Sequence, residues 1–99
     1  MTFRDDWIAA RRVFILRLLS RSDGEANEQV ICTALEHGGF GRDTRDAFRA
    51  DLDHLRQMGC LTEDWFEDVR VVTLTERGTM AAEGRVVVLG VEQSPWRRR

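Results

Sequence analysis

A chain of 99 residues with 42% hydrophobic residues has room for one domain around one modest core. Charged residues make up 32% of it, but their signs nearly balance to a net charge of -2, and all 15 cationic residues are arginine. This balance argues against a protein that coats nucleic acid through bulk positive charge. The longest apolar runs, 13–16 and 86–89, are too short to span a membrane, so we expect a cytoplasmic protein without membrane contact.

The first two predicted elements are helices. Hydrophobic residues recur at helical spacing from Asp5 to Arg21, without glycine or proline, which predicts an amphipathic helix that stops at 22–24. A second helix is predicted to begin at Asn27, whose side chain can accept a hydrogen bond from a free backbone amide. We expect it to end at the glycine pair 38–39.

The third predicted helix begins after Thr44, a favourable N-cap residue, and ends near Met58. Gly59 follows and can adopt the left-handed conformation that closes a helix. The apolar stripe of this helix consists of Phe48, Leu52 and Leu55.

Strand-like segments at 60–66 and 69–75 follow, and Glu67-Asp68 between them predicts a β-hairpin. A short last helix is predicted from Thr75 or Glu76 to Glu83, and an apolar, strand-like piece after Arg85 leads into a polar tail. The predicted fold is therefore mainly α with a small β-hairpin: a winged helix-turn-helix with a three-helix core, a β wing and a short C-terminal helix. We predict this domain at 1–91 and a polar, arginine-rich tail at 92–99.

Several short segments carry a family resemblance. They are Ile15-Leu16-Arg17-Leu18-Leu19, Ala26-Asn27-Glu28, Thr44-Arg45-Asp46, Leu52-Asp53-His54-Leu55, Gly59 and Thr73-Leu74-Thr75-Glu76-Arg77-Gly78. Together they resemble small winged-helix proteins of Mu-like transposable phages and prophages, which are often labelled as ArsR-like regulators. The ending Leu74-Thr75-Glu76-Arg77-Gly78 is shared with MarR-like and other winged-helix regulators. The resemblance implies a winged-helix fold and a phage or prophage origin, with a bacterial or phage-infected cell as the setting. It carries no catalytic or ligand-binding residue across to this chain.

The third helix is the candidate DNA-binding element, because in a winged helix it enters the major groove. Its exposed face has an acidic centre and one basic flank. The predicted partner is double-stranded DNA, and the predicted role is a transcriptional regulator or an accessory in phage DNA processing. The other interpretation is that these arginines pair with nearby carboxylates, Arg49 with Asp53 for example, and form a solvated face. The residues predicted to contact DNA are Arg42, Thr44, Arg45, Arg49 and Arg56.

The predicted wing favours a second hypothesis, a winged-helix interaction module that does not bind DNA. Carboxylates crowd the hairpin, whereas a wing that follows DNA carries cations near its tip. Trp65 and Phe66 lie beside the turn and are candidate anchors for a protein partner. Strand alternation predicts that one of the two faces inward.

The two chain ends allow a homodimer. Trp7, the apolar run 86–91 and Trp96 could form a subunit interface, or they could close the core of one chain. Arg97–Arg99 could contact phosphate groups or serve only to solubilise the tail.

Neither a metal or cofactor site nor an enzyme is predicted. Cys32, His37, His54 and Cys60 match no compact zinc-binding spacing, and we expect reduced, buried thiols and surface histidines instead. The acidic residues are scattered, and no glycine-rich phosphate loop is present, so no catalytic residue is assigned.

Overall fold

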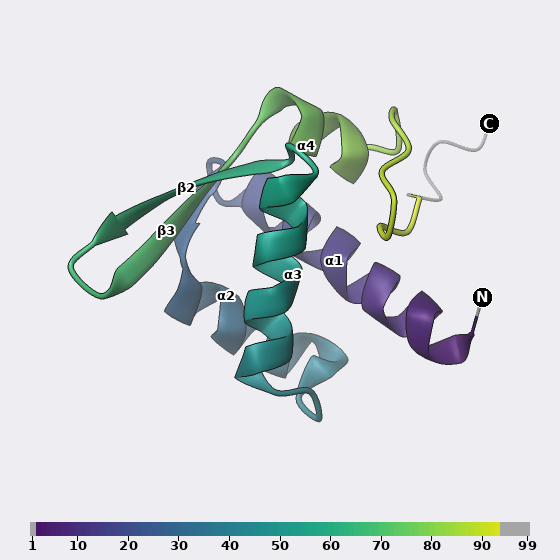
Figure 1. Ribbon diagram of the computed structural model, residues 1–99, viewed down its shortest axis with the longest axis horizontal. Helices are drawn as coiled ribbons and strands as arrows, with labels where there is room; N and C mark the ends of the chain where they lie inside the picture. The colour runs from purple at the N-terminus through teal and green to yellow at the C-terminus, as the bar shows by residue number, and fades with distance from the viewer. Residues whose placement is uncertain (1, 94–99) are drawn as a thin grey trace.

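The computed structural model describes residues 2–93, which are mainly helical with a small antiparallel sheet (Figure 1). Helices pack around one core, and the hairpin formed by β2 and β3 extends away from them on the left of Figure 1. The elements are α1 (Phe3–Arg21), β1 (Glu25–Asn27), α2 (Glu28–Leu35), a π-type turn η1 (Glu36–Phe40), α3 (Arg45–Gln57), β2 (Leu61–Phe66), β3 (Val69–Leu74) and α4 (Glu76–Ala82).

Side-chain caps set where the helices begin. The hydroxyl group of Thr44 and the side-chain oxygen of Asn27 each accept a hydrogen bond from the backbone amide three residues later, at 3.1 and 2.9 Å, so both predicted caps are confirmed. Helix α1 begins at Phe3, two residues before the predicted start. A reciprocal pair of hydrogen bonds between Thr2 and Asp5 caps that earlier first turn.

The chain leaves the regular helical path at the predicted glycine terminator, although the α-helical part of the second helix ends earlier. Helix α2 ends at Leu35, and η1 continues to Phe40 with the left-handed Gly39, φ 106°, inside it. The ring of Phe40 packs edge-on against Trp7 and Phe14, with centroid separations of 5.1 and 5.4 Å. Burial of this ring fixes the position of the chain directly after the kink at Gly39.

Strand β1 was not predicted from the sequence. It pairs antiparallel with β3, with Ala26 opposite Val72, and the sheet order is β1-β3-β2. A three-residue strand is too short to show alternation, and its hydrogen bonds come from a strand more than forty residues away in the chain.

The predicted hairpin and its two-residue connection are confirmed. Strands β2 and β3 pair from Leu61 opposite Leu74 to Phe66 opposite Val69. Glu67, in the connection, has a left-handed φ of 57°, which a tight hairpin turn requires.

The inward orientation predicted for one of the two hairpin aromatics is wrong. Trp65 is 56% exposed and Phe66 is 73% exposed. The end of the hairpin extends beyond the helices, so the rings of Trp65 and Phe66 do not reach the apolar core (Figure 1). Only the base of the hairpin joins the core, through Leu61 and Val72.

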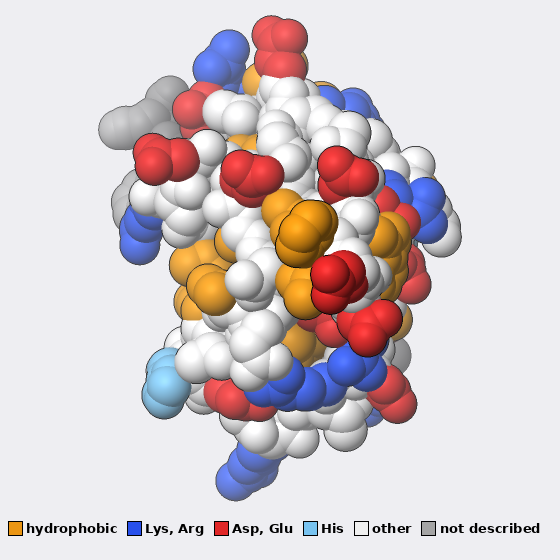
Figure 2. All heavy atoms as spheres, turned by 90° about the vertical axis from the view of Figure 1, so that its left-hand side faces the viewer, with side chains coloured by type: hydrophobic (Ala, Val, Ile, Leu, Met, Phe, Trp, Pro, Cys, Tyr) orange, Lys and Arg blue, Asp and Glu red, His pale blue; other side chains and the backbone are white. Residues whose placement is uncertain are grey.

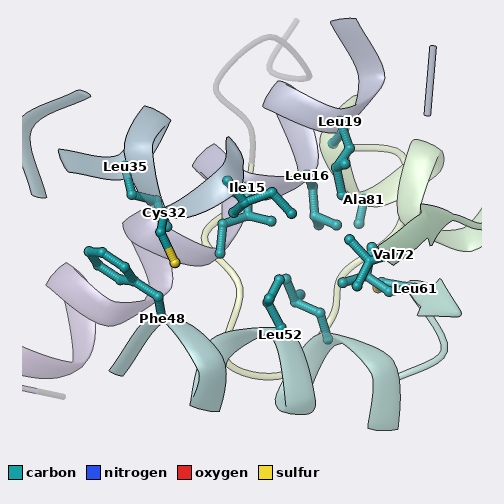
Figure 3. Close-up of a cluster of buried hydrophobic side chains, with 14 of the residues drawn as sticks. Ile15, Leu16, Leu19, Cys32, Leu35, Phe48, Leu52, Leu61, Val72 and Ala81 are labelled. Carbon is teal, nitrogen blue, oxygen red and sulfur yellow. The ribbon is translucent and has the colours of Figure 1, made fainter. Parts of the chain in front are cut away.

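One core unites α1, α2, α3, the base of the sheet and α4, as the close-up in Figure 3 shows. Cys32 and Cys60 are buried free thiols, as predicted. The labelled side chains in that view are Ile15, Leu16, Leu19, Cys32, Leu35, Phe48, Leu52, Leu61, Val72 and Ala81.

The segment after α4 is not the strand-like piece that its apolar residues predicted. It runs as a loop beside α1 and α3, away from the sheet (Figure 1). Val88 is buried in the core, while Val87 and Leu89 are exposed. With β3 already flanked on both sides, this segment satisfies its backbone groups on the helices instead. Trp96 and Arg97–Arg99, to which the dimer and phosphate hypotheses refer, lie outside the described residues.

Candidate interaction surface

The arginines predicted for the DNA-facing helix are held by carboxylates. Arg49 donates from Nε to Glu28 Oε2 at 2.7 Å and from Nη1 to Asp46 Oδ1 at 3.1 Å. Glu28 is the first residue of α2, so the pairing joins α2 to α3. The predicted pairing of Arg49 with Asp53 does not form, because the Asp53 carboxylate accepts from Arg70.

The other two arginines predicted along α3 also have polar neighbours. Arg45 donates to Gln29 Oε1 at 2.8 Å and lies 3.6 Å from Glu36. Arg56 lies 3.7 Å from a carboxylate oxygen of Glu63 on β2. The basic flank of α3 is therefore largely neutralised by α2, η1 and β2.

The start of α3 differs from the rest of the helix. The hydroxyl of Thr44 is occupied as the N-cap, since it accepts from Ala47 N at 3.1 Å. Arg42 is exposed, and within residues 2–93 it makes no hydrogen bond or ion pair. The structure therefore brings Arg45 and Arg49 together beside α2 and leaves Arg42 available to solvent.

Arg70 on β3 is the centre of the charge network. Its side chain is only 6% exposed, and Nε donates to Glu28 Oε1 at 3.1 Å. Nη1 donates to Asp53 at 2.8 Å and to Glu63 at 3.1 Å. Burial works against the charged form, but these hydrogen bonds more than compensate and raise the pKa of Arg70. One guanidinium thus ties together β3, α2, α3 and β2.

Arg70 also supports the aromatic end of the hairpin. Its Cζ lies 5.5 Å from the centroid of the Trp65 ring, within range of a cation–π interaction. Phe66 and Val69, paired across the turn, are 73% and 44% exposed. We call the exposed set Trp65, Phe66 and Val69 the hairpin patch. Figure 2, which faces this end of the molecule, shows apolar side chains surrounded by acidic ones, with a group of basic side chains below.

A second charge network joins α1 to α3. Arg11 and Arg12 both donate to the buried carboxylate of Asp51, and Arg11 also donates to Asp43 Oδ2 at 2.8 Å. Trp7 Nε1 donates to the same Asp43 oxygen at 2.8 Å. Burial disfavours the arginine cation, but these bonds raise the pKa of Arg11 above its ordinary value. Arg11 is thus a structural cation and not part of an exposed basic face.

Arg70 and Asp51 organise the two charge networks, and neither was predicted from the sequence to do so. One signal for Asp51 was present, because it lies at helical spacing from Phe48 and Leu55 and so belongs to the inward face of α3. A carboxylate in an apolar stripe requires a buried cation. For Arg70 no comparable local signal exists, since its partners come from three other elements.

Within residues 2–93 no group of three or more His, Cys, Asp or Glu side chains is arranged to hold a metal ion. None of the helices in this range has the length and apolar character that crossing a membrane requires.

Comparison with known proteins places the chain in a phage family. Uncharacterized protein gp26 of Escherichia phage Mu is 39% identical to this chain over 83 residues, which cover 84% of the chain and 85% of the relative. The chain belongs to the family of this phage protein. No family model matches it, and no solved structure matches it.

Proposed function

We propose that this domain is a winged helix-turn-helix. Helices α1, α2 and α3 form its three-helix core, the hairpin of β2 and β3 is the wing, and α4 is the short C-terminal helix. The sheet order β1-β3-β2 supports this assignment, because a short strand between the first two helices joins the wing to the core.

We propose further that the domain acts as a protein-interaction module of the phage family, with the hairpin patch as its contact surface and with no cofactor or catalytic activity. One observation carries this proposal. Two aromatic side chains are exposed at the end of the hairpin, while the arginines along α3 are engaged by carboxylates. Large aromatic side chains are the usual energetic centres of protein interfaces.

The charge around the hairpin patch supports a protein partner rather than DNA. The acidic residues near the turn would repel phosphate groups, whereas a partner with basic residues around an apolar centre would be attracted. These acidic residues are Asp64, Glu67 and Asp68.

A crosslinking experiment followed by reconstitution tests the interaction. A photo-crosslinking amino acid at Phe66 captures the neighbour in phage-producing cells, and the purified neighbour is then titrated with the unmodified chain. We expect Trp65→Ala to weaken binding by about 30-fold, the equivalent of a central contact worth about 2 kcal/mol. Arg45→Ala should leave the affinity unchanged, and so should Val87→Ala, which alters an exposed hydrophobic residue elsewhere. Equal affinities for the Trp65 variant and the unmodified chain would refute this proposal.

DNA binding through the start of α3 is the second candidate function, in a regulatory or DNA-processing role. Arg42 is the observation that favours it, because this exposed side chain has no polar partner within residues 2–93. The side chains of Arg45 and Arg49 are 37% and 47% exposed, and ion pairs of such exposed side chains contribute little to stability. Phosphate groups could therefore replace those carboxylates at a small cost.

Fluorescence anisotropy with random and phage-derived duplexes tests this candidate at low and physiological salt. If Arg42, Arg45 and Arg49 contact DNA, we expect saturable binding. Its affinity should fall as the salt concentration rises and should be weaker in the Arg45→Ala/Arg49→Ala double variant. The absence of binding even at low salt would exclude DNA and leave the protein-interaction function.

A further inference from the structure

The outer edge of β2 is a free edge of the sheet. In the order β1-β3-β2, β3 has a strand on each side, whereas β2 is paired on one side only within residues 2–93. The strand runs over six residues, Leu61–Phe66, and all of them after Leu61 are exposed. A free edge of this kind presents backbone amides and carbonyls that can pair with another strand.

The pairing at the base of the hairpin shows which backbone groups of β2 point outward. The amide of Thr75 donates to the carbonyl oxygen of Cys60 at 3.0 Å, so the backbone groups of Cys60 are directed toward β3 and its continuation. Because these directions alternate along an antiparallel pair, the N–H and C=O groups of Glu63 and Trp65 point away from the sheet. The β2 residues whose backbone groups are directed toward β3 are Thr62, Asp64 and Phe66.

The side chains along this edge define the chemistry of a strand that could pair with it. The carboxylate of Glu63 already has a cation, since it accepts from Arg70 at 3.1 Å. On the other face of the hairpin, Asp64 makes no hydrogen bond or ion pair in the part of the chain that the structure describes. Phe66, two residues on and on the same face as Asp64, is 73% exposed. A complementary strand would therefore place a cationic side chain beside Asp64 and an apolar one beside Phe66.

The same charges disfavour a second copy of this chain as the occupant. Two β2 edges would bring two sets of carboxylates together, and like charges on paired strands destabilise the pairing. Charged edge strands are one means by which proteins avoid joining to their own copies. Figure 2 shows acidic side chains around the apolar ones at this end of the molecule. The carboxylates of one hairpin are Glu63, Asp64, Glu67 and Asp68.

We propose that β2 pairs along its free edge with an edge strand of a folded partner protein, a strand that carries a basic and an apolar side chain two residues apart. This proposal rests on the proposed protein-interaction function and specifies the kind of partner. Backbone hydrogen bonds to Glu63 and Trp65 would supply affinity, and the side chains beside Asp64 and Phe66 would supply specificity. A strand that is already folded suits the hairpin, because neither surface must then become ordered on association.

Amide hydrogen exchange of the free chain tests the orientation of the edge. We expect the amides of Glu63 and Trp65 to exchange fast and those of Asp64 and Phe66 to exchange slowly, because only the latter are directed toward β3. Slow exchange of Glu63 and Trp65 at every protein concentration would mean that the edge is occupied within one chain. Slow exchange that is lost on dilution would identify a second copy as the occupant. Either result would overturn the proposal.

A synthetic β-hairpin peptide serves as the probe for the partner strand. It is cyclised so that its strands are preformed, and one strand carries arginine and leucine two residues apart on one face. A second peptide has glutamate in place of that arginine. We expect the arginine peptide to slow exchange at Glu63 and Trp65 about tenfold, as one hydrogen bond per amide would. The glutamate peptide should have no effect. The proposal is wrong if the arginine peptide leaves both amides unprotected or if the two peptides act alike.

Reversal of one charge tests the specificity. In Asp64→Lys the arginine peptide should lose its effect on the Glu63 and Trp65 amides, and the glutamate peptide should gain one. The matched control Asp46→Lys makes the same change in charge on α3, at a side chain that is 92% exposed, and should keep the preference of the unmodified chain. Equal peptide preferences in the two variants would contradict the role of Asp64.

The neighbour captured by crosslinking at Phe66 separates failure of this proposal from failure of the proposed function. We expect the purified neighbour to protect the Glu63 and Trp65 amides in the unmodified chain. If it binds in a manner that depends on Trp65 but leaves these amides unprotected, the interaction function stands and strand pairing is wrong. If Trp65→Ala binds it as well as the unmodified chain does, the proposed function itself is refuted, and this proposal with it.

Discussion

The guanidinium of Arg11 on α1 forms an ion pair with the carboxylate of Asp51 on α3 inside the protein, where the two side chains are 6% and 1% exposed. Nε of Arg11 donates to one carboxylate oxygen, and Nη2 donates to the other at 3.2 Å. Arg12 adds a third hydrogen bond to Asp51 at 3.0 Å. The recognition helix of the proposed winged fold is thus attached to α1 by charge as well as by apolar packing.

Removal of the Asp51 charge should destabilise the fold strongly. Asp51→Asn leaves Arg11 buried and only partly compensated by Asp43, so we expect a loss of about 3–5 kcal/mol in the free energy of unfolding, measured by urea denaturation. Asp46→Asn is the control, because the Asp46 side chain is 92% exposed and its loss should change stability by about 0.5 kcal/mol or less. Similar small losses for both variants would contradict the structural role of Asp51.

The hairpin aromatics should matter little for folding. Trp65→Ala removes a ring that is 56% exposed, so we expect the midpoint of urea denaturation to stay close to that of the unmodified chain. Leu52→Ala, on the inward face of α3, should instead cost about 2–5 kcal/mol. A large stability loss for Trp65→Ala would show that the Trp65 ring serves the fold and not a partner.

Stability should fall in acid, partly through Glu28. Burial tends to raise the pKa of Glu28, but hydrogen bonds from Arg49 and Arg70 lower it below its ordinary value of 4.5. Because the folded pKa is the lower one, this contribution is fully present above about pH 5 and is lost as the pH falls through the folded pKa. Glu28→Gln should therefore be less stable at pH 7 and should lose less stability between pH 5 and pH 3. An unchanged pH slope, measured by urea denaturation at each pH, would contradict this.

The two cysteines should be unreactive in the folded protein. Burial raises the pKa of both the Cys32 and the Cys60 thiol, which lowers the fraction of reactive thiolate, and both are inaccessible. We expect slow reaction with Ellman's reagent at pH 8 in buffer and rapid reaction of both thiols in concentrated urea. Fast labelling of the folded chain would show that the core opens around these residues.

The elements that sequence analysis predicted correctly are those with local determinants. Asn27 and Thr44 cap the amides directly after them, and Glu67-Asp68 closes a hairpin between adjacent strands. Strand β1 depends on β3, far away in sequence, and the π-type turn η1 ends where Phe40 packs against Trp7. Such elements are determined by tertiary packing, and the pattern of neighbouring residues in the sequence does not contain this information.

The candidate site was predicted only as a set of arginines and aromatics. Helical spacing placed Arg45 and Arg49 on one flank of α3, but their partners come from α2 and η1. Strand alternation likewise describes which way Trp65 points relative to its neighbours. It does not reveal how far the hairpin extends past the core.

The hydrogen bonds of Arg70 fix the shape of the surface that a partner would contact. They anchor the hairpin to two helices at once, and the Trp65 ring lies over the same guanidinium. A partner would therefore meet a surface that already has its bound shape, and little conformational entropy would be lost on association. Recognition at this surface would resemble the docking of two rigid bodies rather than the folding of one segment onto another.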